Sequence, residues 1–249
     1  MSEATARRFG GVGRLYGEDA AARFAQAKVC VVGIGGVGSW AAEALARSAV
    51  GALTLIDLDM VAESNANRQI HALDDVWGRA KVDVMRERIL AINARCVVRT
   101  VEDFATGENL DALLDGHDVI VDAIDQARVK VAMAAWCAHR GVPLVMAGGA
   151  GGKQDPAQIR NEDLARTTQD PLLAKVRAQL RKLHGFPKDP RRKFGITAVY
   201  STEPLQRPQA CASDAAPQGL SCAGYGSGVC VTAPFGFFAA AATLRLLAG

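Results

Sequence analysis

Residues 28–57, KVCVVGIGGVGSWAAEALARSAVGALTLID, determine the fold class of this chain. Two short apolar runs, 28–32 and 52–56, enclose a turn with four glycines and a helical stretch at 37–48. Continuous apolar runs are typical of parallel strands buried on both faces, and strand, helix and strand in this order form a βαβ unit. We therefore predict a doubly wound, mainly parallel α/β sheet of the Rossmann type.

The same alternation continues along the chain. Further strands are predicted at 96–101, 118–121, 143–147 and 196–200, and further helices at 79–93 and 127–140. The 249 residues are 49% hydrophobic and 22% charged, which is enough apolar material for one large domain. We expect a single domain over 1–249, with a helical insertion at 153–193, where the strand pattern is lost.

The predicted insertion 153–193 is basic. It holds 11 Lys and Arg against 5 Asp and Glu, whereas the formal net charge of the whole chain is only +3. Asp170 suits a helix N-cap, Pro171 the first helical position, and Gly185 the position after the helix. The predicted apolar face consists of Leu173, Val176, Leu180 and Leu183, and the basic residues around it are Lys175, Arg177, Arg181 and Lys182. Such a helix suits an RNA backbone, and the alternative is a solvated charged face.

The two ends of the chain bear on its location. The N-terminus, MSEATARRFGG, lacks the apolar core of a secretory signal, so we expect a cytoplasmic protein. Residues 229–247 have Arg245 as their only charge, and a stretch of this length is almost long enough to span a bilayer. Pro234 and Gly236 favour instead a helix packed on the sheet. Peripheral contact with a membrane stays open.

The turn after the first strand suits a phosphate. Gly33, Gly35, Gly36 and Gly38 lead into the first helix, whose backbone N–H groups and positive end attract anions. Asp57 lies 19 residues after Gly38, at the spacing of a carboxylate that accepts hydrogen bonds from ribose hydroxyls. These residues predict an adenosine nucleotide. A tight turn without a ligand, and the NAD site of an oxidoreductase, are the alternatives.

Cations after the second strand favour a polyphosphate. Arg68 lies in the polar loop SNANRQ, and Lys81 begins the next helix. Two cations that converge on one site suit a triphosphate better than the two phosphates of a dinucleotide. Asp125 ends the fourth strand at the same edge of the sheet, where its carboxylate can hold Mg²⁺ against phosphates. For each residue taken singly there is an alternative role: Asp125 could cap the following helix, and Lys81 could be a solvated surface charge.

The chain resembles the adenylating enzymes related to ubiquitin-activating enzyme in five motifs. In order along the chain these are GIGGVGS, LIDLD, SNANRQ, the helix that begins at Lys81, and AIDQ. The resemblance implies that ATP and Mg²⁺ bind here. The nucleotide-binding residues that it implies, besides the glycines, are Asp57 at the ribose, Asn65, Arg68 and Lys81 at the triphosphate, Asp125 at the metal, and also Asp59. Arg8, in RRFGG, resembles the family arginine that reaches the γ-phosphate of the partner subunit's ATP, which implies a homodimer.

Over nearly its whole length the chain resembles the bacterial tRNA threonylcarbamoyladenosine dehydratases, through RRFGGVGRLYG, NRQIHAL, GGAGG and SCAGYGSG. This family implies that ATP adenylates the carboxylate of threonylcarbamoyladenosine next to the tRNA anticodon. The amide of the modification then attacks the activated carbonyl, a ring closes, and AMP and pyrophosphate are released. The segment 153–193 has no cysteine for a thioester, so a ubiquitin-like partner is not expected.

The six cysteines leave one alternative open. No CxxC pair occurs, so a zinc site is not expected, and most of the cysteines are interpreted as small core residues. Cys222 is the exception because it could carry a persulfide in a sulfur-transferring adenylating enzyme, whose substrate is a small carrier protein. A sulfur-delivery protein and a monovalent cation stay open as further partners.

Overall fold

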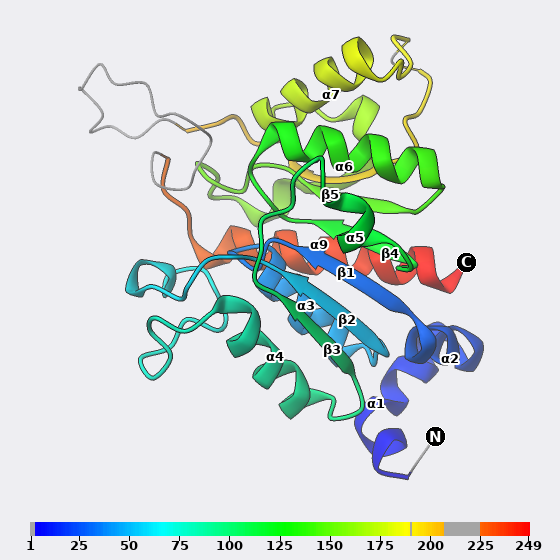
Figure 1. The fold of residues 1–249 in the computed structure, drawn as a ribbon, viewed down its shortest axis with the longest axis vertical. Helices are drawn as coiled ribbons and strands as arrows, with labels where there is room; N and C mark the ends of the chain where they lie inside the picture. The colour runs from blue at the N-terminus through cyan, green and yellow to red at the C-terminus, as the bar shows by residue number, and fades with distance from the viewer. Residues whose placement is uncertain (1–2, 190, 207–224) are drawn as a thin grey trace.

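The computed structural model describes residues 3–189, 191–206 and 225–249, which form one seven-stranded sheet with helices on both faces (Figure 1). The strand order is β3-β2-β1-β4-β5-β7-β6, and every neighbouring pair is parallel except β6 with β7. The strands are β1 (Lys28–Val32), β2 (Ala52–Ile56), β3 (Val97–Val101), β4 (Val119–Asp122), β5 (Leu144–Ala147), β6 (Ile159–Asp163) and β7 (Thr197–Ser201). The predicted doubly wound α/β fold is confirmed.

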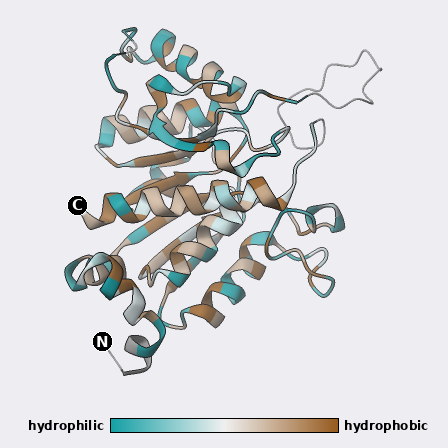
Figure 2. Cartoon of the chain, turned by 180° about the vertical axis from the view of Figure 1, so that it is seen from behind, coloured by the Kyte–Doolittle hydropathy of each residue, from teal (hydrophilic) through white to brown (hydrophobic). Residues whose placement is uncertain are grey.

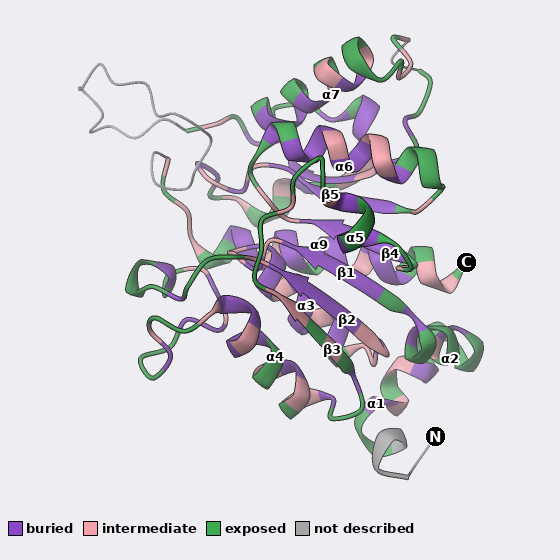
Figure 3. Ribbon diagram, viewed as in Figure 1, coloured by how far each residue is buried: buried purple, intermediate pink, exposed green. Residues whose placement is uncertain are grey.

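Alternate side chains of the strands divide the core into two layers. Val29 and Val31 of β1 belong to the apolar cluster that includes α3, α4 and α9, whereas Cys30 and Val32 belong to the cluster of α5, α6 and α7. Figure 2 shows the first of these layers and Figure 3 the buried central strands. The helices are α1 (Glu3–Tyr16), α2 (Glu18–Gln26), α3 (Gly38–Arg47), α4 (Lys81–Ile92), α5 (Leu110–Leu114), α6 (Ala127–Arg140), α7 (Pro171–Leu183) and α9 (Val229–Ala248).

Strand β6 is an element that the sequence pattern does not predict. It lies in the segment 153–193, at the edge of the sheet, and among the described residues it pairs with β7 alone. An edge strand needs no continuous apolar run because one side of its backbone has no neighbouring strand, and β6 reads IRNED accordingly. The basic segment therefore supplies a strand to the sheet as well as the predicted helix.

Helix α7 begins as predicted but buries a different set of leucines. The Asp170 carboxylate accepts a hydrogen bond from the backbone N of Leu173 at 2.9 Å, and Pro171 occupies the first helical position. Leu183, expected on the apolar face, is 62% exposed, and Leu172 is buried instead. The prediction for Leu183 is wrong because the layer formed with α6 extends only to Leu180.

Helix α9 packs on the sheet, as predicted. By length and composition it is apolar enough to cross a membrane, yet 56% of its most apolar window is buried within the fold. Gly236 lies where α9 meets α3, since a Cβ atom there would come within 2.6 Å of the Val37 carbonyl oxygen. The close contact at Gly236 explains why this segment, rich in small residues, is a core helix.

Candidate active site

The ends of five neighbouring strands enclose a cavity of about 370 Å³. It lies where β1 leads to α3 on one face of the sheet and β4 leads to α6 on the other, the point at which doubly wound sheets bind ligands. Its polar and glycine lining includes Gly33, Gly35, Gly36, Asp57, Asp59, Arg68, Gln69, Lys81, Asp103, Asp125, Gln126, Gly148, Gly149 and Gly151.

The glycine turn forms one wall and fixes the start of α3. Gly33 has φ of +89°, a conformation that favours glycine. Gly38 does not line the cavity, and a Cβ atom there would lie 1.7 Å from the Gly33 carbonyl oxygen. Gly38 is therefore needed for the turn and the helix to pack, and the other three glycines expose the backbone to a ligand.

Asp57 holds the glycine turn to the end of β2. Its Oδ2 accepts a hydrogen bond from the Ile34 backbone N at 2.6 Å, and its Oδ1 accepts one from the Asp59 backbone N at 2.9 Å. A carboxylate has further acceptor capacity beyond these two bonds. Asp57 can thus position the turn and still accept a hydrogen bond from a ribose hydroxyl.

Lys81 and Arg68 supply positive charge to the cavity. Lys81 is only 6% exposed, and its Nζ lies 2.7 Å from Oδ2 of Asp59. Lys81 is therefore not a solvated surface residue. The Arg68 guanidinium bonds the Ser64 carbonyl oxygen at 2.7 Å and Oδ1 of Asn67 at 3.0 Å, which holds this side chain along the cavity wall.

Besides Gly38, two further predicted site residues of the described ranges, Asn65 and Arg8, lie outside the cavity lining. Asn65 is buried, and its side-chain oxygen accepts a hydrogen bond from the Ala62 backbone N at 3.2 Å. Arg8 donates to the Ile92 carbonyl oxygen at 2.9 Å, at the end of α4 remote from Lys81. The helix between them is roughly 16 Å long at 1.5 Å per residue. Arg8 therefore cannot reach the cavity of its own chain.

Asp125 presents an exposed carboxylate to the cavity. No hydrogen bond or ion pair with another residue of the described ranges occupies it. Those ranges also contain no group of three or more His, Cys, Asp or Glu residues that would hold a metal without help from a ligand. Mg²⁺ commonly binds to one or two carboxylates together with substrate phosphates, and the Asp125 carboxylate fits this arrangement.

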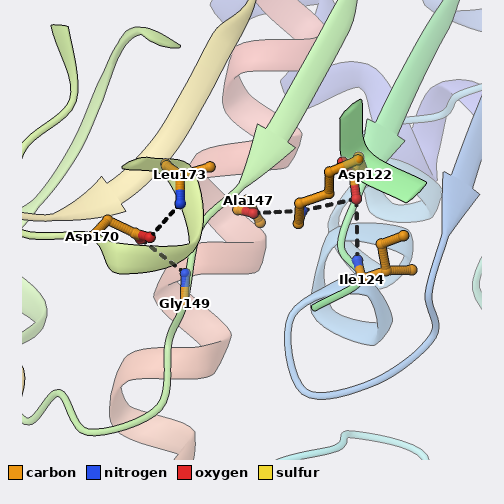
Figure 4. A network of polar contacts seen from close by, with 7 residues as sticks. Asp122, Ile124, Ala147, Gly149, Asp170 and Leu173 are labelled. Atoms are coloured by element: carbon orange, nitrogen blue, oxygen red, sulfur yellow. Dashed lines mark hydrogen bonds and ion pairs between the residues drawn. The ribbon is translucent and has the colours of Figure 1, made fainter. Parts of the chain in front are cut away.

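A buried ion pair lies directly behind the cavity wall and was not predicted. Lys130 of α6 and Asp122 of β4 are both 0% exposed, with Nζ 2.9 Å from Oδ1 (Figure 4). Nζ also donates to the Ala147 carbonyl oxygen at 2.7 Å, while Oδ1 accepts from the Ile124 backbone N at 3.2 Å. Burial raises the pKa of the Asp122 carboxyl, and Lys130 opposes this rise. The pair links the ends of β4 and β5, which form neighbouring parts of the wall.

Asp170 supports the wall that follows β5. One carboxylate oxygen accepts from Leu173, as described, and the other accepts from the Gly149 backbone N at 2.9 Å (Figure 4). Burial raises the pKa of Asp170, whereas its two backbone hydrogen bonds lower it. The N-cap of α7 is thereby also an anchor for the loop after β5.

Residues 11–249 match the ThiF family. The chain belongs to this family. It is 50% identical to the tRNA threonylcarbamoyladenosine dehydratase of Escherichia coli (strain K12) over 98% of this chain and 95% of that protein. Solved structures of the E. coli dehydratase in complex with ATP and with AMP have TM-scores of 0.89 and 0.90 and identities of 48% and 50%. Each covers 99% of this chain and 96% of the other.

Within this ThiF-family fold, most of the predicted nucleotide-binding residues meet at one place. The residues that line the cavity are Gly33, Gly35, Gly36, Asp57, Asp59, Arg68, Lys81 and Asp125. Sequence reasoning missed Asp122 and Lys130. The available signal was a lysine inside an apolar helix, eight residues after an aspartate that ends a buried strand. Cys222, the predicted sulfur acceptor, lies outside the described residues.

Proposed function

We propose that this chain is an ATP-dependent tRNA threonylcarbamoyladenosine dehydratase that works through an adenylate. The observation that carries the proposal is the convergence of Arg68, Lys81 and Asp125 on a glycine-lined cavity. Relatives named as this dehydratase match the chain over nearly its full length, and one has been solved with ATP and with AMP. ATP and AMP are the substrate and the product expected of an adenylating enzyme.

The chain's own groups would act mainly on phosphate charge. N–H groups of the glycine turn, Arg68 and Lys81 lie where they can stabilise the negative charge that develops on departing pyrophosphate. Asp57 would hold the ribose, and Asp59 keeps the Lys81 ammonium in place. Mg²⁺ bound at Asp125 would neutralise part of the phosphate charge. These groups turn a carboxylate oxygen into part of a good leaving group, AMP.

Ring closure then needs no nucleophile from the enzyme. The attacking amide belongs to the same modified nucleoside as the activated carbonyl, and tethering of this kind supplies up to roughly 7–11 kcal/mol of the barrier. The enzyme has only to hold the two groups together and exclude water. The products are the cyclised nucleoside in tRNA, AMP and pyrophosphate, with a net loss of one water from the nucleoside.

The basic segment would bind tRNA, through fewer side chains than its sequence indicates. Lys175 and Lys182 of α7 are exposed. Arg177 bonds the hydroxyl of Thr167, and Arg181 donates to the Pro187 carbonyl oxygen at 3.1 Å and lies over the Phe194 ring. The two arginines have structural partners, so the RNA contact is tested with Lys175→Ala/Lys182→Ala. Each lost phosphate contact lowers the slope of log affinity against log salt by about 0.7 to 0.9.

A homodimer completes the proposal. Arg8 lies at the far end of α4 from its own cavity, so a contact with ATP requires the cavity of a second copy. Mixing Arg8→Ala chains with Lys81→Ala chains would give dimers in which one cavity has both residues. Recovery of activity on mixing is expected, and no recovery from two folded, dimeric variants would exclude this role for Arg8. A tRNA substrate is consistent with the cytoplasmic location expected from the sequence.

The deciding experiment is to incubate the purified protein with ATP and bulk tRNA and to analyse nucleotides and digested nucleosides by mass. AMP and a nucleoside lighter by one water are expected. Arg68→Ala or Lys81→Ala should each slow the reaction about 10²-fold or more, as removal of a group that stabilises developing charge does. Arg86→Ala, an exposed arginine on α4 outside the cavity lining, is the control. ADP as the product, or NAD reduction in a parallel incubation, would contradict the proposal.

Sulfur transfer through Cys222 is the second candidate, and it is less supported. Cys30, Cys96 and Cys137 are buried, and burial raises the pKa of Cys96 to about 11 and that of Cys137 to about 12, so neither is a ready nucleophile. AMP release that depends on a small carrier protein and is unaffected by tRNA would favour sulfur transfer.

A further inference from the structure

A second hollow adjoins the nucleotide cavity. It has a volume of about 720 Å³ and lies between the first half of α6, the second half of α7 and the loop after β3. Phe104, Ala105 and Gln126 line both spaces, so the two are adjacent. None of the groups assigned above to ATP, Mg²⁺ or pyrophosphate lies in the hollow, and it is large enough for a nucleoside.

The hollow has an apolar floor and exposed apolar side chains at its rim. Val129 and Ala132, which lie three residues apart on one face of α6, form the floor. At the rim, Phe104 is 51% exposed and Leu183 is 62% exposed, although both are large apolar residues. Leu183 also departs from the otherwise buried apolar face of α7. An apolar surface beside an exposed aromatic ring suits a base, because every base has a face that can stack.

Unpaired cations occur on the two helices that border the hollow. Arg128 is the second residue of α6, a position where the positive helix end disfavours a cation, and the first turn holds no acidic residue. Within the ranges that the structure describes, no hydrogen bond or ion pair joins Arg128 to another residue. Lys175 and Lys182 lie one heptad apart on α7, on either side of Gln179, which lines the hollow.

The charges around the hollow favour an anion. Glu108 is the acidic residue of its lining, against Arg128 in the lining and the two exposed lysines of α7. Aromatic and apolar surface for bases, together with cations for the backbone, is the combination that binds single-stranded nucleic acid. A carrier protein would not need the apolar floor and the unpaired cations together.

We infer that this hollow is a subsite for an unstacked nucleotide of the RNA substrate, one that neighbours the reacting nucleoside in the anticodon loop. The base lies on the Val129–Ala132 floor against Phe104, and Arg128 contacts its phosphate. This inference rests on the proposed function, because the RNA must bring its modified adenosine to the adjoining cavity. The subsite would explain how the enzyme distinguishes a single-stranded loop from a duplex, because the bases of a duplex are paired and stacked.

Three variants test the subsite without touching the nucleotide cavity. Arg128→Ala should raise the KM for tRNA about tenfold, with kcat within twofold and unchanged binding of ATP. It should also lower the salt slope for binding of an anticodon stem-loop RNA by about 0.7, the value for one single-strand phosphate contact. Leu183→Ser should raise the KM for tRNA and leave the slope unchanged, since it removes no charge. Arg128→Lys should recover most of the slope but not the full affinity.

Arg86→Ala is the matched control, because it removes one exposed arginine of another helix. If Arg128→Ala matches this control in KM and in salt slope while the parent cyclises tRNA, the hollow is not an RNA subsite. Loss of ATP affinity in Arg128→Ala would assign the residue to the nucleotide cavity and also overturn the inference. A parent enzyme that releases no AMP with tRNA would overturn the proposed function and this inference together.

Discussion

Removing the Lys130 ammonium should destabilise the protein far more than removing any surface charge. In Lys130→Met, Asp122 stays buried with only the Ile124 N–H at 3.2 Å on Oδ1, and the Ala147 carbonyl oxygen loses its donor. Breaking a buried ion pair costs about 3–5 kcal/mol because a charge is left uncompensated. For a chain of this size, about 2–4 °C of melting temperature corresponds to each kcal/mol, so we expect a fall on the order of 10 °C.

Urea unfolding followed by tryptophan fluorescence measures this loss, and two further variants separate its causes. Asp122→Asn/Lys130→Met should be more stable than Lys130→Met alone, because no unpaired charge remains buried. Arg140→Met, on the same helix, breaks an exposed ion pair with Asp111 and should cost less than about 1 kcal/mol. A loss of under about 1 kcal/mol in Lys130→Met, or a double variant no more stable than the single one, would refute the argument.

The pH dependence gives an independent check. Burial raises the folded-state pKa of Asp122, and loss of Lys130 removes the charge that opposes this rise. A carboxyl whose folded pKa lies above its unfolded value is destabilising where it is ionised, and this cost falls as the pH is lowered through the folded pKa. The stability difference between Lys130→Met and the parent should therefore shrink on acidification. A difference that grows would contradict the assigned charge on Asp122.

Three further predictions concern other parts of the chain. Gly38→Ala should cost at least about 3 kcal/mol in urea unfolding, because its Cβ atom would lie 1.7 Å from a backbone oxygen. Gly35→Ala should keep the stability of the parent, because no atom lies nearer than 4.0 Å to its Cβ position, and should weaken ATP binding in calorimetry. His71 is 1% exposed, and burial and the charge of Lys81 lower its pKa from 6.5 to about 4. The folded protein therefore binds this proton less readily than the unfolded chain does. As the pH falls from 6.5 towards 4, the free energy of unfolding should decrease by up to about 3 kcal/mol. His71→Leu should flatten this part of the stability profile, and an unchanged profile would contradict the assignment. Cys222→Ser should retain tRNA cyclisation, whereas its loss in a folded variant that binds ATP would favour a persulfide.

Much of the fold was predictable because its strands are buried on both faces. The runs at β1 and β2 have the predicted bounds, since most of their side chains are apolar and buried on both faces of the sheet. Helix α1 was missed because it contains Gly10, Gly11 and Gly13, which lower helix propensity. There the tertiary packing outweighs the local preference. Strand β6 was missed because an edge strand tolerates polar residues.

The candidate site was predictable where function needs a residue type at a fixed place along the chain. The glycine turn and Asp57 directly follow β1 and β2, and Lys81 begins the helix after β2, so the alternation of strands and helices placed them at one edge of the sheet. The hydrogen bonds of Asn65, and the structural partners of Arg177 and Arg181, depend on segments whose approach the sequence pattern does not specify. The sequence alone does not tell whether a charged side chain on a helix is exposed to solvent or bonded to another part of the chain.

The two hydrogen bonds of Asp170 make α7 and the wall after β5 thermodynamically linked. Whatever pulls the N-terminus of α7 also pulls Gly149, because one carboxylate holds both. Reciprocity then applies: if a ligand on α7 changes the affinity of the cavity by some factor, a ligand in the cavity changes the affinity of α7 by the same factor. Binding of ATP in the cavity is thus expected to change the affinity of the proposed RNA-binding surface on α7 through a single side chain.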